Sequence, residues 1–294
     1  MRILLLCLFS LLAACQSHHA AAPPAPIAPQ GRDHADFGVI RELATGRALT
    51  PQELVEHLAG APRVLVGEQH DNPDHHALQL WLLRELAAQR PQGSLLMEML
   101  NPDQQARVDA AQAASRAGHP PADPYQALAW QANWDWGVYG AVVNYALRQP
   151  YPLLAANLDR SQILQIYQQR PTLSGDASTR PQVQATLLDD IRGSHCGLLP
   201  EALLPAMLAV QQQRDRRMAE RLLAAPTPAL LLAGAFHVRK DLGVPLHLKD
   251  LGAAQGNVVL VLAEAGKTVS AENADYVWYT AAQPEQDHCA LLRQ

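Results

Sequence analysis

Four ionisable residues of this sequence each follow a short apolar segment, and their types suit metal binding or proton transfer. They are Glu68, His70, Glu98 and His237. Two imidazoles and one carboxylate form a ligand set that leaves one position on a divalent metal ion open for water. In that interpretation His70, His237 and Glu98 hold the metal, and Glu68 is the general base of a hydrolytic reaction.

The competing interpretation is a polar network that only holds loops together. We favour a functional pocket, because isolated buried ionisable groups are costly unless they are paired.

Both histidines stand in the same local pattern, a glycine followed three residues later by a histidine. The two copies are Gly67-Glu68-Gln69-His70 and Gly234-Ala235-Phe236-His237. A glycine permits a tight exit from a strand, and the histidine can then face the space beyond the strand end. The polar residues after His70 need only a structural explanation, because Asp71 or Asn72 can cap a helix that Pro73 begins.

A cation and a further histidine follow the second copy of this pattern. Arg239 at the mouth of a pocket favours an anionic ligand, or it pairs with Glu68 or Glu98. Downstream, Gly243-Val244-Pro245 indicates a rigid turn that presents His247 to the same ligand.

A glycine-flanked segment carries another histidine and one of two cysteines in the body of the chain. His195 lies between Gly193 and Gly197, where an imidazole projects into solvent or onto a flat ligand. Cys196 follows it, and Cys289 lies near the end of the sequence. An oxidising compartment permits the two to pair, and a free buried thiol is the equal alternative, because sequence does not supply the Cα separation.

Five short apolar segments predict buried strands, and helical patterns lie between them. The strands are expected at Arg63–Gly67, Ser94–Met97, Pro152–Ala156, Ala229–Ala233 and Asn257–Ala263. The clearest helical patterns are Asp74–Gln89 and Pro200–Ala225. This alternation predicts an α/β fold with a largely parallel central sheet flanked by helices. The segment Pro102–Trp136 interrupts it and is interpreted as a helical excursion, or cap.

Polar residues follow four of the five predicted strands. Open α/β sheets bind ligands beyond the carboxyl ends of their strands. We therefore expect Glu68, His70, Glu98, His237 and Asn157 to meet in one pocket.

The first residues indicate export and lipid attachment. Residues 1–14 combine one cation, Arg2, with an apolar run that is too short to span a bilayer, so they are typical of a signal peptide. Small residues precede Cys15, as in lipoprotein precursors, so we expect Cys15 to be the lipidated N-terminus of the mature protein. Gln16 is not the aspartate that retains lipoproteins in the inner membrane, which favours the outer membrane, facing the periplasm, as its location.

A polar tether is expected to connect the lipid to a single large domain. Residues 15–35 are rich in Ala, Pro, Ser and His and predict a flexible segment, and residues 36–294 are long enough for one α/β domain. A net charge of −5 without a basic run argues against nucleic acid as a partner. No Cys-x-x-Cys-His pattern is present, so any haem would be bound without thioether bonds.

Several long segments resemble the ChaN-type lipoproteins. They are Val66–Pro73, Glu98–Leu100, Ala155–Leu158, His195–Gly197, Gln211–Ala219 and Gly234–Pro245, within a similarity from about Gly46 to about Thr280. Phe236 departs from the pattern, because a small residue is expected there; it narrows the pocket beside His237.

The resemblance implies an iron-regulated outer-membrane lipoprotein that binds haem non-covalently, as a homodimer enclosing haem at its interface, and serves haem uptake with a receptor or transporter. A histidine or tyrosine would be the axial ligand, and His76, His195 and His247 are the candidates, while Arg239 would meet the propionates. The wider superfamily contains Tiki-type metalloproteases and erythromycin esterases, so a metal-dependent hydrolase of the cell envelope remains the alternative.

Overall fold

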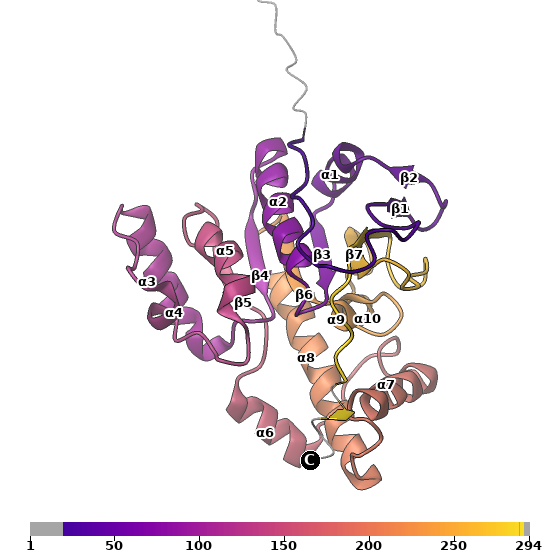
Figure 1. The fold of residues 1–294 in the computed structure, drawn as a ribbon. Coiled ribbons are helices and arrows are strands. Elements are labelled where there is room, and N and C mark those ends of the chain that lie inside the picture. Colours follow the sequence, from indigo (N-terminus) through magenta and orange to yellow (C-terminus); the bar gives the residue numbers. More distant parts are fainter. Residues whose placement is uncertain (1–19, 288, 291–294) are drawn as a thin grey trace, which may run out of the picture.

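One mixed sheet of eight strands organises the molecule. The computed structural model describes residues 20–287, 289 and 290 of the chain (Figure 1). The strand order is β2-β1-β8-β7-β3-β6-β4-β5. The strands are β1 (Ile40–Glu42), β2 (Ala48–Leu49), β3 (Arg63–Glu68), β4 (Ser94–Met97), β5 (Leu153–Ala155), β6 (Ala229–Gly234), β7 (Asn257–Glu264) and β8 (Tyr276–Thr280). The six strands from β8 to β5 are parallel, and β1 and β2 extend the β8 edge antiparallel.

Helices cover both faces of this sheet. They are α1 (Pro51–Ala59), α2 (Pro73–Gln89), α3 (Gln105–Arg116), α4 (Pro124–Ala127), α5 (Trp136–Ala146), α6 (Arg160–Gln169), α7 (Pro181–Ser194), α8 (Leu204–Ala224), α9 (Ala235–Val238) and α10 (Val244–Asp250). Two short turns, η1 (Pro102–Gln104) and η2 (Glu201–Leu203), precede α3 and α8. The α/β prediction is confirmed.

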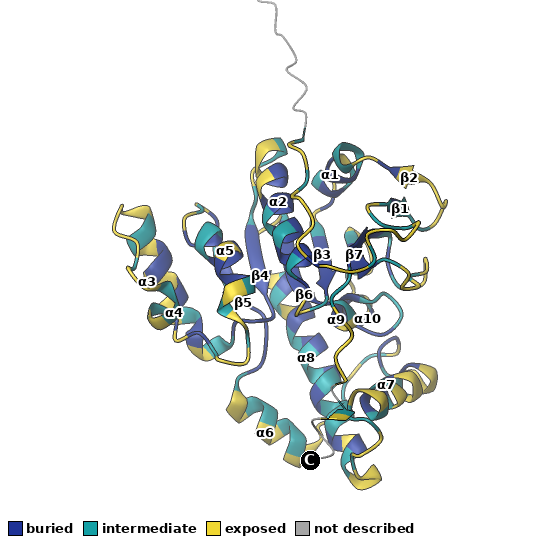
Figure 2. Ribbon diagram, in the orientation of Figure 1, coloured by how far each residue is buried: buried dark blue, intermediate teal, exposed yellow. Residues whose placement is uncertain are grey.

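The alternation of side chains along the strands divides the core into two layers. On β6, Leu230 and Leu232 pack in one apolar cluster with α2, α3 and α5. Leu231 points to the opposite face, where α8, α9 and α10 contribute to a second cluster. Successive strand residues face opposite sides of a sheet, so a strand covered on both faces is apolar throughout. Figure 2 shows the resulting buried strands between half-buried helices.

The five predicted strands correspond to β3 to β7, and the structure adds three that the sequence analysis did not include. These are β1, β2 and β8. The predicted helices correspond to α2 and to η2 with α8, and the excursion contains η1, α3 and α4. Trp130 of this segment packs edge-on against Trp136, and Trp134 packs edge-on against His70.

The predicted flexible tether differs from the structure, because its described part, residues 20–35, is held to the domain at several points. Trp81 Nε1 of α2 donates to the Ala21 carbonyl at 3.0 Å, and the Ile27 and Ala28 amides both donate to Asp74 at 2.5 and 3.2 Å. Gln30 pairs with Ala282 beside the sheet. Proline-rich composition favours an extended chain, but these buried partners hold it in one place.

The signal peptide and Cys15 lie outside the described residues. Within residues 20–287, 289 and 290, no helix has the length and apolar character needed to cross a membrane.

Candidate functional site

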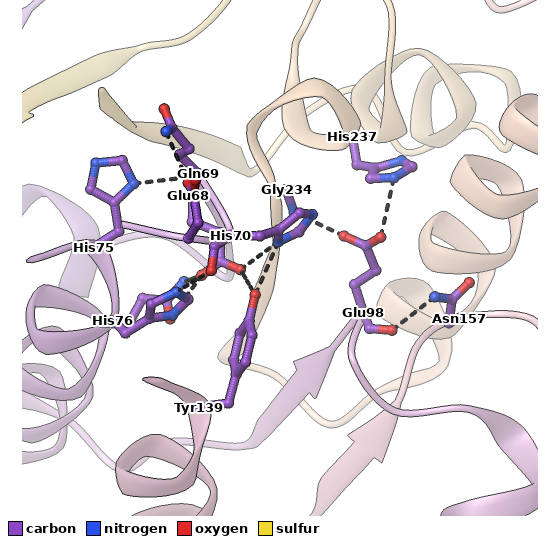
Figure 3. A network of polar contacts seen from close by, with 12 residues as sticks. Glu68, Gln69, His70, His75, His76, Glu98, Tyr139, Asn157, Gly234 and His237 are labelled. Atoms are coloured by element: carbon purple, nitrogen blue, oxygen red, sulfur yellow. Dashed lines mark hydrogen bonds and ion pairs between the residues drawn. The ribbon is translucent and has the colours of Figure 1, made fainter. Parts of the chain in front are cut away.

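The predicted convergence of polar residues at the strand ends is present. Because β3, β6, β4 and β5 are neighbours, Glu68 at the end of β3 and Glu98 just after β4 flank Gly234 at the end of β6 (Figure 3). The Gly234 amide donates to Glu98 Oε2 at 2.8 Å, and the Asn157 side chain donates to the Glu98 carbonyl at 2.9 Å. The parallel topology therefore joins residues that lie far apart in the sequence.

Glu68 is the centre of the first part of the network. His70 Nδ1 lies 2.9 Å from Glu68 Oε1, the Tyr139 hydroxyl donates to the same oxygen at 2.5 Å, and Gln79 donates to Oε2. Burial alone raises the pKa of Glu68, but hydrogen bonds from His70 and His76 outweigh it and lower the pKa to about 2. Glu68 is thus a buried carboxylate with every oxygen engaged.

His76 and His75, adjacent in α2, have pKa values that are shifted in opposite directions. His76 Nε2 donates to the His70 carbonyl at 2.9 Å, while its Nδ1 faces Glu68 Oε2 at 3.2 Å. Both ring nitrogens of His76 therefore face acceptors. Burial lowers the pKa of His76, but the hydrogen bond to Glu68 and the charge of Glu68 raise this pKa overall. His75 Nδ1 instead accepts from the Gln69 amide at 2.8 Å, and burial lowers its pKa to about 3. Burial therefore favours neutral His75, whereas Glu68 favours the charged form of His76.

His237 lies between two carboxylates on the other side of Gly234. Its Nδ1 is 2.5 Å from Asp215 Oδ1 on α8, and its Nε2 is 3.2 Å from Glu98 Oε1. Burial disfavours the charged ring, but the charges of Glu98 and Asp215 outweigh it and raise the pKa of His237 to about 10. Burial acts against ionisation of Glu98 as well, and the His237 charge holds the Glu98 pKa well below its usual range.

The glycine of each Gly-x-x-His pattern permits close approach. A Cβ on Gly234 would lie 2.8 Å from His70 Nε2, and a Cβ on Gly67 would lie 2.4 Å from a methyl carbon of Val238. Both distances are shorter than any side chain tolerates, so each glycine allows another segment to cross the strand end.

The cavity beside this network is largely apolar. It has a volume of about 370 Å³ and includes His70, whose side chain is 42% exposed. Phe236 is 63% exposed and lines both this cavity and a neighbouring one of about 360 Å³. The apolar walls of the first cavity include Leu187, Ile191, Phe236 and Leu242.

The metal-ligand set expected from His70, His237 and Glu98 does not have the required arrangement. Both nitrogens of His237 are engaged by carboxylates, and Nδ1 of His70 is engaged by Glu68. Within residues 20–287, 289 and 290, no group of three or more His, Cys, Asp or Glu side chains is placed so that it could hold a metal ion. In this arrangement the side chains neutralise one another.

Two of the three candidate haem-ligand histidines are buried. His76 is enclosed by Glu68 and Gln79, and His247 is fully buried in α10, where its Nδ1 accepts from Arg216 at 3.3 Å. The expectation that a turn presents His247 to a ligand was wrong, because the glycine and proline begin α10 and turn that side chain into the core. Burial lowers the pKa of His247.

His195 is the candidate that remains accessible. It caps the C-terminus of α7 and is half-buried. Its Nδ1 lies 2.8 Å from the Ile191 carbonyl, so Nδ1 carries the proton and Nε2 keeps its lone pair. Ser194, immediately before it, and Ile191, one helical turn earlier on α7, line the apolar cavity.

Arg239 has neither of the predicted carboxylate partners. It forms a two-point ion pair with Asp241, with Nη2 to Oδ2 at 2.6 Å and Nε to Oδ1 at 3.0 Å, instead of reaching Glu68 or Glu98. Its side chain lines the second cavity together with Lys267.

Cys196 and Cys289 form a disulfide with a Cα separation of 5.7 Å. Their bond connects the loop after α7 to the C-terminal segment. Cys196 has a φ of +59°, a left-handed conformation that non-glycine residues adopt infrequently.

The sequence analysis identified neither Asp215 as a partner of His237 nor Tyr139 as a partner of Glu68. Asp215 lies within the predicted Pro200–Ala225 helix, three residues before the buried Met218. An acid on the apolar stripe of a helix was the available signal, because a buried charge requires a partner.

Comparison with known proteins agrees with this fold and these motifs. The family model for ChaN, described as haem-binding uptake in the Tiki superfamily, matches residues 54–248. The chain belongs to the ChaN family. A ChaN of Campylobacter jejuni, whose structure shows cofacial haem binding, has 31% identity and a TM-score of 0.75, and the match covers 83% of this chain and 97% of that one.

More distant solved structures share much less with this ChaN family member. An erythromycin esterase in its open conformation has 13% identity and a TM-score of 0.46, covering 84% of each chain. A succinoglycan biosynthesis protein has 11% identity and a TM-score of 0.45, covering 72% of this chain and 69% of its own. No curated protein matches the chain.

Proposed function

We propose that this ChaN family member binds haem non-covalently and contributes to bacterial haem uptake, with His195 as an axial ligand. The observation that carries the proposal is the state of His195, whose Nδ1 donates to a backbone carbonyl while Nε2 retains its lone pair. Metal-ligating histidines are generally oriented by such a hydrogen bond. In this proposal the protein carries iron in the form of haem.

The surroundings of His195 fit a flat apolar ligand. Ile191 and Leu187 on the same helix, with Leu242 and Phe236 opposite, give the neighbouring cavity apolar walls. The macrocycle would gain by removing these side chains from water. Arg239 and Lys267, in the adjoining cavity, are the cations available to propionates.

A homodimer that encloses haem accounts for the exposed apolar residues at this edge. Phe236, Leu198 and Leu164 are 63%, 53% and 56% exposed. Phe236 lies on α9 after β6, Leu164 lies on α6 after β5, and Leu198 lies in the loop after α7. Cofacial haem binding in the Campylobacter jejuni ChaN supports the same arrangement here. Burying these side chains between two copies would stabilise the assembly.

Titration of the protein with haemin tests the ligand. The segment after Cys15 is purified, and its Soret band is followed for the parent protein and for His195→Ala. Loss of an axial ligand is expected to weaken haemin binding by roughly tenfold or more and to shift the band.

His119→Ala is the matched control, because His119 is exposed at the end of α3. A Soret titration that is the same for His195→Ala and His119→Ala would remove His195 as the ligand. No saturable band in the parent protein would contradict haem binding itself.

The location proposed for the protein is the outer membrane, anchored by lipid on Cys15 and facing the periplasm, where it hands haem to an uptake partner. The small residues before Cys15 and the absence of an aspartate after it support this. Radioactive palmitate should label the parent chain and not Cys15→Ser, and the label should sediment with outer-membrane fractions. Labelled protein in the inner membrane would contradict the location.

A further inference from the structure

The loop after α7 places a cysteine where the backbone favours glycine. The Cys196 amide donates to the Gly193 carbonyl at 2.9 Å, and the Gly197 amide donates to the Arg192 carbonyl at 2.8 Å. These two bonds form a Schellman motif, in which the residue after the helix cap takes a left-handed conformation. Here the cap is His195 and that residue is Cys196, with a φ of +59°. A side chain disfavours this conformation, so the loop needs support from another part of the chain.

Noncovalent contacts support this loop only weakly. Leu198 is 53% exposed. The ion pair between Arg192 and Glu201 spans the loop, but the two side chains are 40% and 72% exposed, and such surface pairs contribute little to stability. Within the described residues, the Cys196–Cys289 disulfide is the one covalent bond that ties the loop to a distant segment. The disulfide is therefore the strongest constraint on the loop.

The other end of the disulfide belongs to a segment that is attached to the sheet. After β8, Ala282 and Gln30 exchange backbone hydrogen bonds at 2.8 and 3.0 Å, and the Gln283 amide donates to Glu264 Oε1 of β7 at 2.8 Å. Six residue steps separate Gln283 from Cys289, so Cys289 stays within about 22 Å of this attachment. In Figure 1 this yellow segment descends from the sheet toward α7. The disulfide thus connects the loop after α7 to the β7 and β8 part of the sheet.

The orientation of His195 depends on how this loop is held. Its Nδ1 hydrogen-bonds to the Ile191 carbonyl in the last turn of α7, which leaves Nε2 to a ligand. The last turn of a helix keeps its geometry only while its free carbonyls are satisfied, and the amides of Cys196 and Gly197 satisfy two of them here. If Cys196 leaves the left-handed conformation, these bonds are lost and the His195 ring is no longer fixed. Support of Cys196 therefore acts on the proposed haem ligand.

We propose that the Cys196–Cys289 disulfide positions His195 for haem, so that the chain gains its full haem affinity only when this bond forms. The inference rests on the ligand and the location given in the proposed function. The bond forms by exchange with a disulfide-carrying oxidant: the S–S bond of the oxidant breaks, one S–S bond forms between the two cysteines, and two electrons and two protons pass to the oxidant. The periplasm supplies such oxidants, whereas the cytoplasm keeps thiols reduced. Haem capture then begins only after export.

Two thiol-free variants that differ by one methyl group test the role of the loop conformation. Cys196→Ala with Cys289→Ala keeps a side chain at the left-handed position without the disulfide, and haemin affinity should fall roughly tenfold, with the Soret band of His195→Ala. Cys196→Gly with Cys289→Ala supplies the residue that this position favours, and should recover most of the affinity and the parent band. Circular dichroism verifies that both variants are folded. Parent-like binding by the first variant, or an equal loss in both, overturns the positioning role.

Oxidation of the parent protein tests the same role without a substitution at either cysteine. The protein that begins after Cys15 contains only Cys196 and Cys289 as cysteines. It is reduced under nitrogen, freed of reductant and titrated with haemin before and after treatment with oxidised glutathione. Oxidation should raise the affinity roughly tenfold in the parent and leave it unchanged in His195→Ala. No gain in the parent, or an equal gain in His195→Ala, overturns the proposal.

The His195→Ala titration separates this outcome from failure of the proposed function. If His195→Ala binds haemin weakly and the reduced and oxidised parent proteins bind it equally, only the positioning role of the disulfide is wrong. If His195→Ala binds haemin as tightly as the parent, His195 is not the ligand, and the positioning role is wrong with it.

Discussion

Two histidines at the same edge of the sheet, His237 and His195, have opposite chemical states. His237 belongs to the strand-end network, defined by Glu68, His70, His76, Glu98, Asp215 and His237, and both of its nitrogens face carboxylates. Nδ1 of His195 lies on a backbone carbonyl, and within the described residues no carboxylate faces its other nitrogen. A carboxylate on each side stabilises an imidazolium, which has no lone pair to give to iron, whereas a carbonyl on one side fixes the ligating tautomer.

The comparison shows that proximity to a strand end does not define a ligand. The strand-end network contains more acids and histidines than the loop after α7, but its charges are already compensated within the protein. We expect the network to determine stability and His195 to determine haem binding.

Removal of one carboxylate from the network should have the largest effect. In Asp215→Asn the buried imidazolium of His237 retains only Glu98, which should lower the free energy of unfolding by about 3 to 5 kcal/mol. Urea unfolding of the haem-free protein measures this. Asp189→Asn is the matched control, because the Asp189 side chain is 76% exposed and its ion pair with Arg192 is worth about 1 kcal/mol or less. Equal losses in the two variants would contradict the stabilising role of the network.

The pH dependence of stability should show two limbs, each from a buried histidine. The folded pKa of His237 is raised to about 10, so its contribution is complete below about pH 6.5 and is lost as the pH rises to 10. The folded pKa of His75 is lowered to about 3, so protonation of the unfolded chain reduces stability as the pH falls from about 6.5 to 3.

Two variants assign these limbs. His237→Gln should flatten the alkaline limb, and His75→Gln should flatten the acid limb, when urea midpoints are measured across pH. The assignment is wrong if either variant only shifts the whole curve without changing its slope.

The close approach at Gly234 should be sensitive to one methyl group. Gly234→Ala places a Cβ 2.8 Å from His70 Nε2, so we expect a loss of about 1 to 3 kcal/mol from overpacking. Gly193→Ala in α7 has no atom within 4 Å of the added Cβ and should stabilise by up to about 1 kcal/mol. Thermal unfolding of both proteins checks the opposite signs, and a stable Gly234→Ala protein would mean that His70 moves freely.

The smallest effect on stability is expected at Phe236. Because this ring is 63% exposed, Phe236→Ala should change the free energy of unfolding by about 0.5 kcal/mol or less. Haemin affinity should nevertheless fall several-fold, since the ring lines the proposed binding surface. Ile27→Ala is the control, because Ile27 is similarly apolar, 59% exposed and lies on the segment before β1; an identical loss of affinity there would place the haem elsewhere.

The sequence was sufficient for much of the architecture. Apolar runs of four to seven residues predicted five parallel strands, since a strand covered by helices on both faces needs apolar residues throughout. It also predicted which residues meet at the strand ends, because parallel strands place their carboxyl ends at one edge. Asn72 illustrates the local level: it caps α2 by accepting from the Asp74 amide at 3.0 Å, one of the two caps that the sequence allowed.

Tertiary structure decided the chemistry of those residues. His76, His195 and His247 were equivalent as candidate ligands in the sequence, and packing buried two of them and left the third accessible. Asp215 could not be assigned to His237 from a spacing of 22 residues, because only the packing of α8 beside β6 and α9 brings them together. Periodicity reports which face of an element is buried, whereas a protonation state depends on the partners that other elements supply.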